Sequence, residues 1–180
     1  MTKEITLCVP KYVKKFLLSE PDYELLGPDT ILAPQKSELG KLIAGFSRMI
    51  PYNQNIEPLV LTKSTEALTI QYLCKKKALD VPVERYATLV SFLDEQFRAS
   101  LIREVSAIHA IHSEPEYAWM VRSFLDRRNV VTNDEHDKDM EWDTAKKIYR
   151  DHLERINRKN VRNRKLSQPV LSGLGAFCRA

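Results

Sequence analysis

The sequence predicts a mainly α-helical protein: a helical bundle with a short N-terminal strand or small sheet and a basic C-terminal helix and tail. Apolar residues recur every three or four positions through much of the chain, the spacing of one face of an amphipathic helix. Only 5 of the 180 residues are glycine, too few for a fold with many tight hairpins. With 43% hydrophobic and 29% charged residues, the composition is that of a folded globular protein. We therefore expect one mainly helical domain over residues 1–160 and a basic, flexible tail over 161–180.

The first 34 residues are expected to contain one strand and one helix. Apolar and polar residues alternate over 4–9, which predicts a short strand. Pro10 suits the first turn of a helix over 11–18. Residues 21–34 hold three prolines and a glycine, so they should form an irregular connection with a brief extended piece at 30–32.

The middle of the chain gives mixed signals. Helical spacing predicts a helix over 35–50, and 51–63 should be a loop in which 59–61 has the composition of a short strand. In the segment 64–79, every second residue from 68 to 72 is apolar, as in a strand, but Leu68, Tyr72 and Leu79 also suit one face of a helix. We favour the helix here.

Three amphipathic helices are predicted beyond Pro82. The first is long, roughly seven turns, because its apolar residues repeat every three or four positions from Tyr86 to Ile108. A shorter helix should end near Asp126. The last helix should begin at, or slightly after, a capping-box pattern over 132–135, in which a threonine and a glutamate satisfy free backbone amides.

Charge is distributed unevenly along the chain. The formal net charge is +4, yet residues 146–165 hold nine basic and two acidic residues, a local net charge of +7, which leaves −3 for the rest. Six acidic residues between 134 and 143 precede this segment, and acids at the start of a helix with bases toward its end suit the helix dipole. The nine basic residues are the candidate nucleic-acid-binding residues: Lys146, Lys147, Arg150, Arg155, Arg158, Lys159, Arg162, Arg164 and Lys165.

This basic segment predicts DNA or RNA as the partner. Lysines and arginines on a helix can contact successive phosphates and release counterions from the nucleic acid. Two other interpretations stay open. The segment can be a solvated helix end that only balances the helix dipole. Alternatively, the protein is a helical interaction or assembly subunit, in which the acidic and basic segments pair with a protein partner or with other copies in a homo-oligomer.

The N-terminal strand followed by two helices has the order of a ribbon-helix-helix DNA-binding unit. In such a unit, Glu4, Thr6 and Cys8 would enter the major groove. An acid and a thiol suit that role poorly, and the connection between the two predicted helices is long. We favour a strand that lies at the edge of a small sheet.

No motif for catalysis or metal binding is present. The acidic run over 133–143 lacks the glycine and the final glutamate of an EF-hand, and His109 and His112 are three residues apart without an accompanying metal-binding pattern. We therefore expect no enzyme, no metal and no cofactor. Three widely separated cysteines fit a reducing compartment, and no apolar run approaches the roughly 18 residues of a membrane span. These observations predict a cytoplasmic protein without a membrane partner.

The segment from Phe124-Leu125-Asp126 through the acidic turn to Trp142-Asp143-Thr144-Ala145-Lys146-Lys147-Ile148-Tyr149-Arg150 carries a family resemblance. It resembles the C-terminal end of small uncharacterised proteins carried by phages and other mobile elements of Bacteroidetes, over residues 84–158. The chain departs from that pattern at Asp151-His152, where a further basic residue is expected. The resemblance implies a mobile-element context, and no catalytic residue is implied by it.

Overall fold

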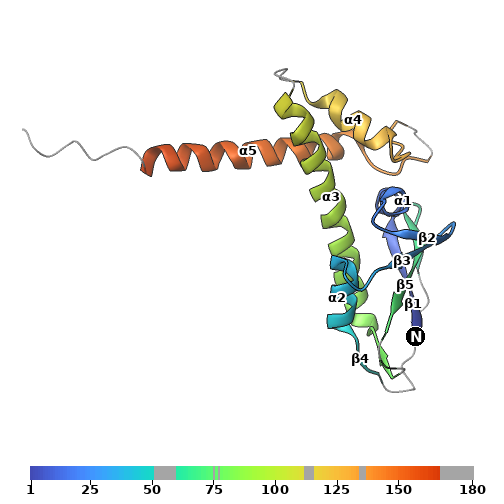
Figure 1. Cartoon of the computed structure of the whole chain (residues 1–180). Coiled ribbons are helices and arrows are strands. Elements are labelled where there is room, and N and C mark those ends of the chain that lie inside the picture. Colours follow the sequence, from blue (N-terminus) through green and yellow to red (C-terminus); the bar gives the residue numbers. More distant parts are fainter. Residues whose placement is uncertain (51–59, 75, 77, 112–115, 134–136, 167–180) are drawn as a thin grey trace, which may run out of the picture.

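A mixed β-sheet with helices packed against it forms the body of the protein, and a long helix projects from this body (Figure 1). The computed structural model describes residues 1–50, 60–74, 76, 78–111, 116–133 and 137–166. The strands are β1 (Thr2–Pro10), β2 (Glu24–Gly27), β3 (Thr30–Ala33), β4 (Arg48–Met49), β5 (Thr65–Leu73) and β6 (Leu79–Asp80). The helices are α1 (Lys11–Ser19), α2 (Glu38–Phe46), α3 (Tyr86–Ile111), α4 (Ala118–Asp126) and α5 (Trp142–Leu166), with a short 3-10 turn at Val83–Arg85.

The fold is α+β, so the prediction of a mainly α-helical bundle is wrong. Within the described ranges, four strands form a sheet in the order β1-β5-β3-β2, and β4 pairs with β6 in a second, two-stranded sheet. The segment 64–79, for which we favoured a helix, contains the central strand β5. It pairs antiparallel with β1 from Thr2↔Leu73 to Pro10↔Thr65, and parallel with β3 on its other side. The segment forms a strand because both edges of β5 pair with other strands. Its alternating apolar residues then face the helices.

The remaining N-terminal predictions are largely confirmed. The strand over 4–9 lies within β1, and the helix over 11–18 lies within α1. The extended piece at 30–32 lies within β3. The rest of 21–34 is not simply irregular, because β2 pairs with β3.

In the middle of the chain, the helix predicted over 35–50 is shorter than expected, because α2 ends at Phe46 and β4 follows. Of the segment 59–61, residues 60 and 61 are not in a strand and Leu59 lies outside the described residues.

The core lies between the sheet and helices α1 and α3. Ile5, Leu7 and Val9 of β1 are 0–3% exposed, as their alternation predicts, and α1 and α3 both contact this strand. Phe97 of α3 is fully buried, and its ring centroid lies 5.6 Å from that of Phe16 of α1. The core therefore unites elements from the start and the middle of the chain.

Helix α3 connects the sheet to the helices at the other end of the molecule. It spans 26 residues, about 39 Å at 1.5 Å per residue. Its Phe97 also contacts Phe124 of α4, with 5.8 Å between ring centroids, and its last turns contact α5 (Figure 1). The long helix predicted beyond Pro82 is confirmed.

Helix α5 begins at Trp142, ten residues after Thr132, and Asp134 and Glu135 of the capping-box pattern lie outside the described residues. Its last turns, 161–166, reach into the segment expected to be a flexible tail, and 167–180 lie outside the described residues. Among the described helices, none combines the length and apolarity needed to cross a membrane.

Candidate nucleic-acid interface

The N-terminal half of α5 is anchored on α3 and α4. Ala145, Ile148 and Tyr149 are buried on the side that faces these helices, as amphipathic spacing requires. The Tyr149 hydroxyl and the His109 Nδ1 of α3 are 3.0 Å apart, within hydrogen-bonding distance, and Tyr117 packs against Tyr149 with 5.1 Å between ring centroids. This aromatic cluster fixes the direction in which α5 leaves the body.

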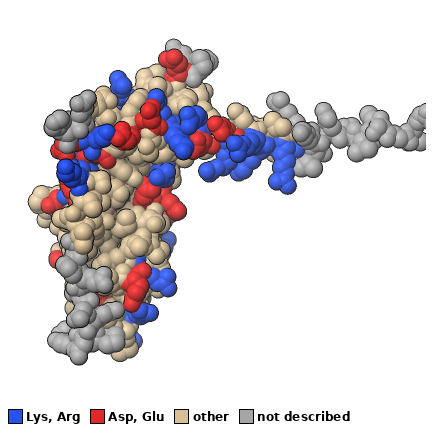
Figure 2. Space-filling model, turned by 180° about the vertical axis from the view of Figure 1, so that it is seen from behind, with Lys and Arg blue, Asp and Glu red and all other residues tan. Residues whose placement is uncertain are grey.

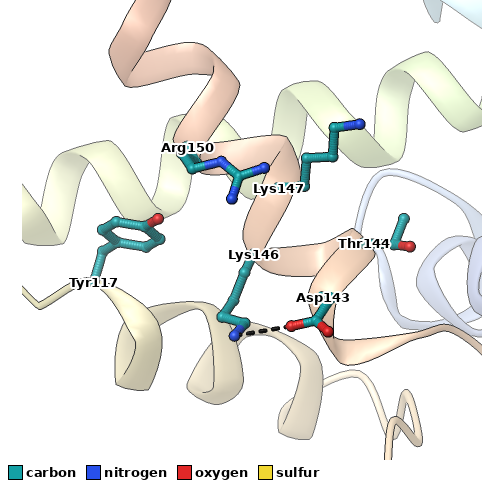
Figure 3. Close-up of a pocket in the computed structure, with 6 residues that line it drawn as sticks. All are labelled: Tyr117, Asp143, Thr144, Lys146, Lys147 and Arg150. Carbon is teal, nitrogen blue, oxygen red and sulfur yellow. Dashed lines mark ion pairs between the residues drawn. The ribbon is translucent and has the colours of Figure 1, made fainter.

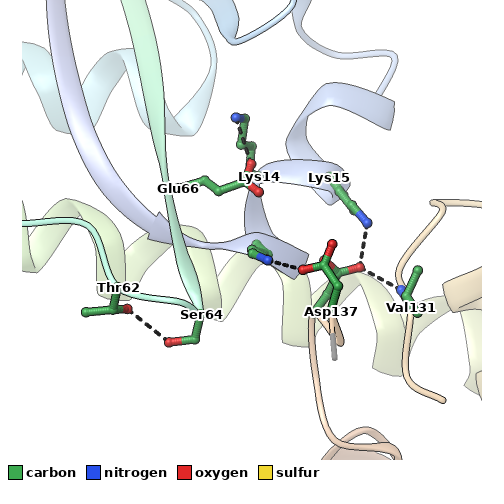
Figure 4. Close-up of polar contacts among 9 residues, drawn as sticks. Lys14, Lys15, Thr62, Ser64, Glu66, Val131 and Asp137 are labelled. Atoms are coloured by element: carbon green, nitrogen blue, oxygen red, sulfur yellow. Dashed lines mark hydrogen bonds and ion pairs between the residues drawn. The ribbon is translucent and has the colours of Figure 1, made fainter. Parts of the chain in front are cut away.

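The acidic segment before α5 is held by lysines of α1 (Figure 4). The Asp139 side chain is 2% exposed, and it accepts hydrogen bonds from the Lys15 Nζ at 2.6 Å and the Val131 backbone N–H at 2.7 Å. Next to it, Lys11 forms a hydrogen-bonded ion pair with Asp137, and this contact lowers the pKa of Asp137 and raises that of Lys11. Two carboxylates of the acidic segment thus hold the start of α5 against α1.

This role of the acidic segment was missed by sequence reasoning, which assigned the acids to the helix dipole. The signal was present only as complementary charge: two lysines four residues apart on one helix, and two carboxylates two residues apart more than 120 positions later. Such a pair can be recognised only when the fold places α1 beside 137–139.

The C-terminal half of α5 leaves the body. Every residue from Glu154 to Asn163 is exposed, and Figure 1 shows this part of the helix extending away from all other elements. The sequence explains the departure, because only Ile156 and Val161 are apolar there, and they are 40% and 53% exposed. We call residues 154–166 the projecting arm.

Four of the predicted residues form one basic stripe on this arm. Arg155, Arg158, Lys159 and Arg162 are spaced i, i+3, i+4 and i+7, so they share one face of the helix. Figure 2 shows lysines and arginines gathered along one edge of the arm. Only Arg158 has an acidic partner, Glu154 at 3.2 Å, among the residues that the structure describes. We call these four residues the distal stripe.

Three other predicted residues lie nearer the body and face another direction. At about 100° per residue, Lys146, Lys147 and Arg150 point roughly 120° away from the distal stripe. Lys146 pairs with Asp143 at 3.0 Å, and Arg150 lies 3.9 Å from Asp151. The structure therefore divides the basic segment into two groups. Arg164 and Lys165 belong to α5, but their side chains lie outside what is described.

The proximal group lines a pocket where α4 and α5 meet (Figure 3). The pocket has a volume of about 290 Å³. In Figure 3, the Tyr117 hydroxyl points toward α5 and Arg150, whereas Lys147 extends away from Tyr117. The place of Tyr117 in this pocket could not be read from the sequence. The lining residues are Tyr117, Asp143, Thr144, Lys146, Lys147 and Arg150.

The lysines of α1 do not extend the basic surface, because each one has an acidic partner. Besides the pairs of Lys11 and Lys15, the Lys14 ammonium is 2.6 Å from Asp29 and 2.9 Å from Glu66. Burial acts to lower the pKa of Lys14, but the hydrogen bonds to these two carboxylates outweigh it and raise the pKa. These lysines serve the fold.

The N-terminal strand β1 lies at the edge of the four-stranded sheet, and two of the residues considered for a ribbon-helix-helix unit contact the neighbouring strand β5. Glu4 accepts a hydrogen bond from Gln71 at 2.5 Å, and the hydroxyls of Thr6 and Thr69 are 3.2 Å apart, both across the β1–β5 pair. The preferred interpretation, a strand at the edge of a small sheet, agrees with its terminal position in the strand order.

Among the described residues, no group of three or more histidine, cysteine, aspartate or glutamate side chains could hold a metal ion. His109 is engaged with Tyr149, and His112 lies outside the described residues.

Comparison with known proteins adds no relative: no family model, no curated protein and no solved structure matches this chain.

Proposed function

We propose that this protein is a nucleic-acid-binding accessory or regulatory protein that contacts the phosphates of DNA or RNA through α5. The observation that carries the proposal is the projecting arm, a solvent-exposed helix whose distal stripe presents four cations on one face. Following the sequence resemblance, we place it in a phage or other mobile element and in the cytoplasm, with no catalytic role.

The shape of the arm supports this function. An α-helix with side chains is about 10–12 Å across, and the major groove of B-DNA is about 12 Å wide. Because every described side chain of the arm is exposed, the arm can enter a groove or follow a strand without moving the body. From Arg155 to Arg162 the distal stripe covers about 10 Å of helix axis, enough to meet more than one phosphate.

Binding to duplex DNA over a salt series tests the proposal. Wild type should bind at low salt with a steep loss of affinity as salt rises. A variant in which Arg155, Arg158, Lys159 and Arg162 are all changed to Gln should bind more weakly, with a salt slope smaller by about 3–4 if each cation meets a phosphate.

A matched control removes four charges from the body. Lys36, Lys41, Lys63 and Lys76 are exposed and have no ion-pair partner among the described residues. Changing all four to Gln should leave the salt slope close to that of wild type. Equal losses of affinity in the two quadruple variants would show that only the net charge of the protein matters. The proposal is refuted if wild type, at low salt, binds neither duplex nor single-stranded DNA or RNA.

One observation favours a second function, that of an assembly subunit. Ile156 and Val161 are apolar and exposed on the arm, where a protein partner or a second copy could cover them. Light scattering without nucleic acid distinguishes the two functions. Under the assembly hypothesis, the protein forms oligomers that the double substitution Ile156→Ser and Val161→Ser disperses.

A further inference from the structure

The pocket between α4 and α5 has the charge of a specific anion site. Three cationic side chains line it, Lys146, Lys147 and Arg150, against one carboxylate, Asp143. Its lining therefore carries a net charge of +2. A phosphate monoester carries about −1.5 to −2 at pH 7 because its second pKa is near 6, whereas each internal phosphodiester of a strand carries −1. The charge matches the monoester better.

The donors in the pocket also suit a phosphate group. The Arg150 guanidinium offers several N–H donors in a planar fork that matches phosphate oxygens, and Asp151, its nearest acid, is 3.9 Å away. Tyr117 and Thr144 add hydroxyl groups from the opposite wall and from the first turn of α5. Among the residues described, no hydrogen-bond or ion-pair partner holds the Lys147 ammonium; it extends away from Tyr117 and adds positive charge on the other side of the pocket (Figure 3).

The walls of the pocket are held in place and its size is limited. Tyr117 packs against Tyr149, which is 1% exposed and linked to His109, so this wall of the pocket rests on a buried ring. The volume of about 290 Å³ lies just below the usual range for small-molecule sites, roughly 300–1,000 Å³. It suits a ligand of about the size of one nucleotide.

We propose that this pocket binds a phosphate monoester, the group found at the 5′ end of a nucleic-acid strand and in a mononucleotide. Arg150 and Arg155 are five residues apart, about 7.5 Å along α5. A strand whose end occupies the pocket therefore reaches the distal stripe; this second step rests on the proposed nucleic-acid function. The pocket itself does not.

Calorimetry with the full-length protein tests the pocket directly, with AMP and adenosine as the probes. AMP should bind about 10-fold or more tightly than adenosine, the size expected from charge-assisted hydrogen bonds to one phosphate. Arg150→Gln should abolish the difference, and Asp143→Asn should increase AMP affinity because it removes the competing carboxylate. Arg103→Gln, which changes an exposed arginine of α3, should leave the AMP preference unchanged.

Single-stranded oligonucleotides with and without a 5′ phosphate then identify the source of the monoester. Tighter binding of the phosphorylated strand, lost in Arg150→Gln, assigns strand ends. A preference for AMP without any preference between the strands assigns free nucleotides and still supports the pocket. Equal binding of AMP and adenosine, or no binding of either, overturns the pocket even if the distal stripe binds duplex DNA. Conversely, AMP binding without duplex binding would refute only the proposed function.

Discussion

At the scale of single residues, Asp139 is the carboxylate that most strongly fixes the start of α5. Its side chain is buried and holds both the Lys15 ammonium and the Val131 backbone N–H. Asp139→Ala should lower the free energy of unfolding by about 2 kcal/mol, because the Val131 amide loses its partner and the Lys15 ammonium loses its counter-charge. Urea denaturation measures this change.

Asp126→Ala provides the matched control, since Asp126 is exposed and its carboxylate has no ion-pair partner among the described residues. This variant should stay within about 0.5 kcal/mol of wild type. If both variants unfold at the same urea concentration as wild type, Asp139 does not hold the segment before α5.

At the scale of elements, the two halves of α5 differ in what stabilises them. Residues 145–153 include buried side chains, whereas every described side chain of the projecting arm is exposed. An unsupported helix shorter than about 12–15 residues is marginal in water. Hydrogen exchange followed by mass spectrometry should therefore show fast exchange in the arm and slow exchange over 145–153.

Added duplex DNA should slow exchange in the arm, because binding stabilises its helical state. The same experiment with the distal-stripe quadruple variant should show no such protection. Slow exchange in the arm of the free protein, at a concentration where it is monomeric, would contradict this account of α5.

The sequence predicted elements whose apolar pattern is unambiguous and local. β1, α1, α3 and α4 each carry one clear periodicity, so the burial of their apolar face follows from spacing alone. β5 could not be assigned in this way, because its pattern fits both periods and its partners lie about 60 and 40 residues earlier in the chain. Together with β2 and the pair β4–β6, which were also not predicted from the sequence, this strand makes the fold α+β and not mainly α.

The candidate site was predicted only in part. The basic residues and their helix were read from the sequence, and the spacing of Arg155, Arg158, Lys159 and Arg162 already implied one face. The departure of the arm from the body and the pocket at Tyr117 depend on how α4 and α5 pack, which no local pattern encodes.

At the scale of the whole molecule, stability and the proposed function occupy different parts of the chain. Truncation after Glu154 removes all of the arm except Glu154 itself, and the described side chains of the arm are all exposed. The free energy of unfolding should stay within about 0.5 kcal/mol of the full-length value, while duplex binding should be lost. Urea denaturation and a binding titration on the same preparation measure both quantities.

The opposite result would be a truncated protein that is much less stable but still binds duplex DNA. It would show that the arm stabilises the fold and that the binding residues lie in the body.

The ion pairs between α1 and residues 137–139 also constrain how the protein is made. Lys15 and Asp139 are 124 positions apart, so a ribosome must release most of the polypeptide before the base of α5 can close. Until then the sheet is also incomplete, because β1 has no strand partner before β5 has emerged. Chains dominated by such distant pairings fold slowly. During synthesis, the basic arm therefore emerges after the sheet and the helices that carry it, and it reaches its final direction only once the segment 137–139 has docked on α1.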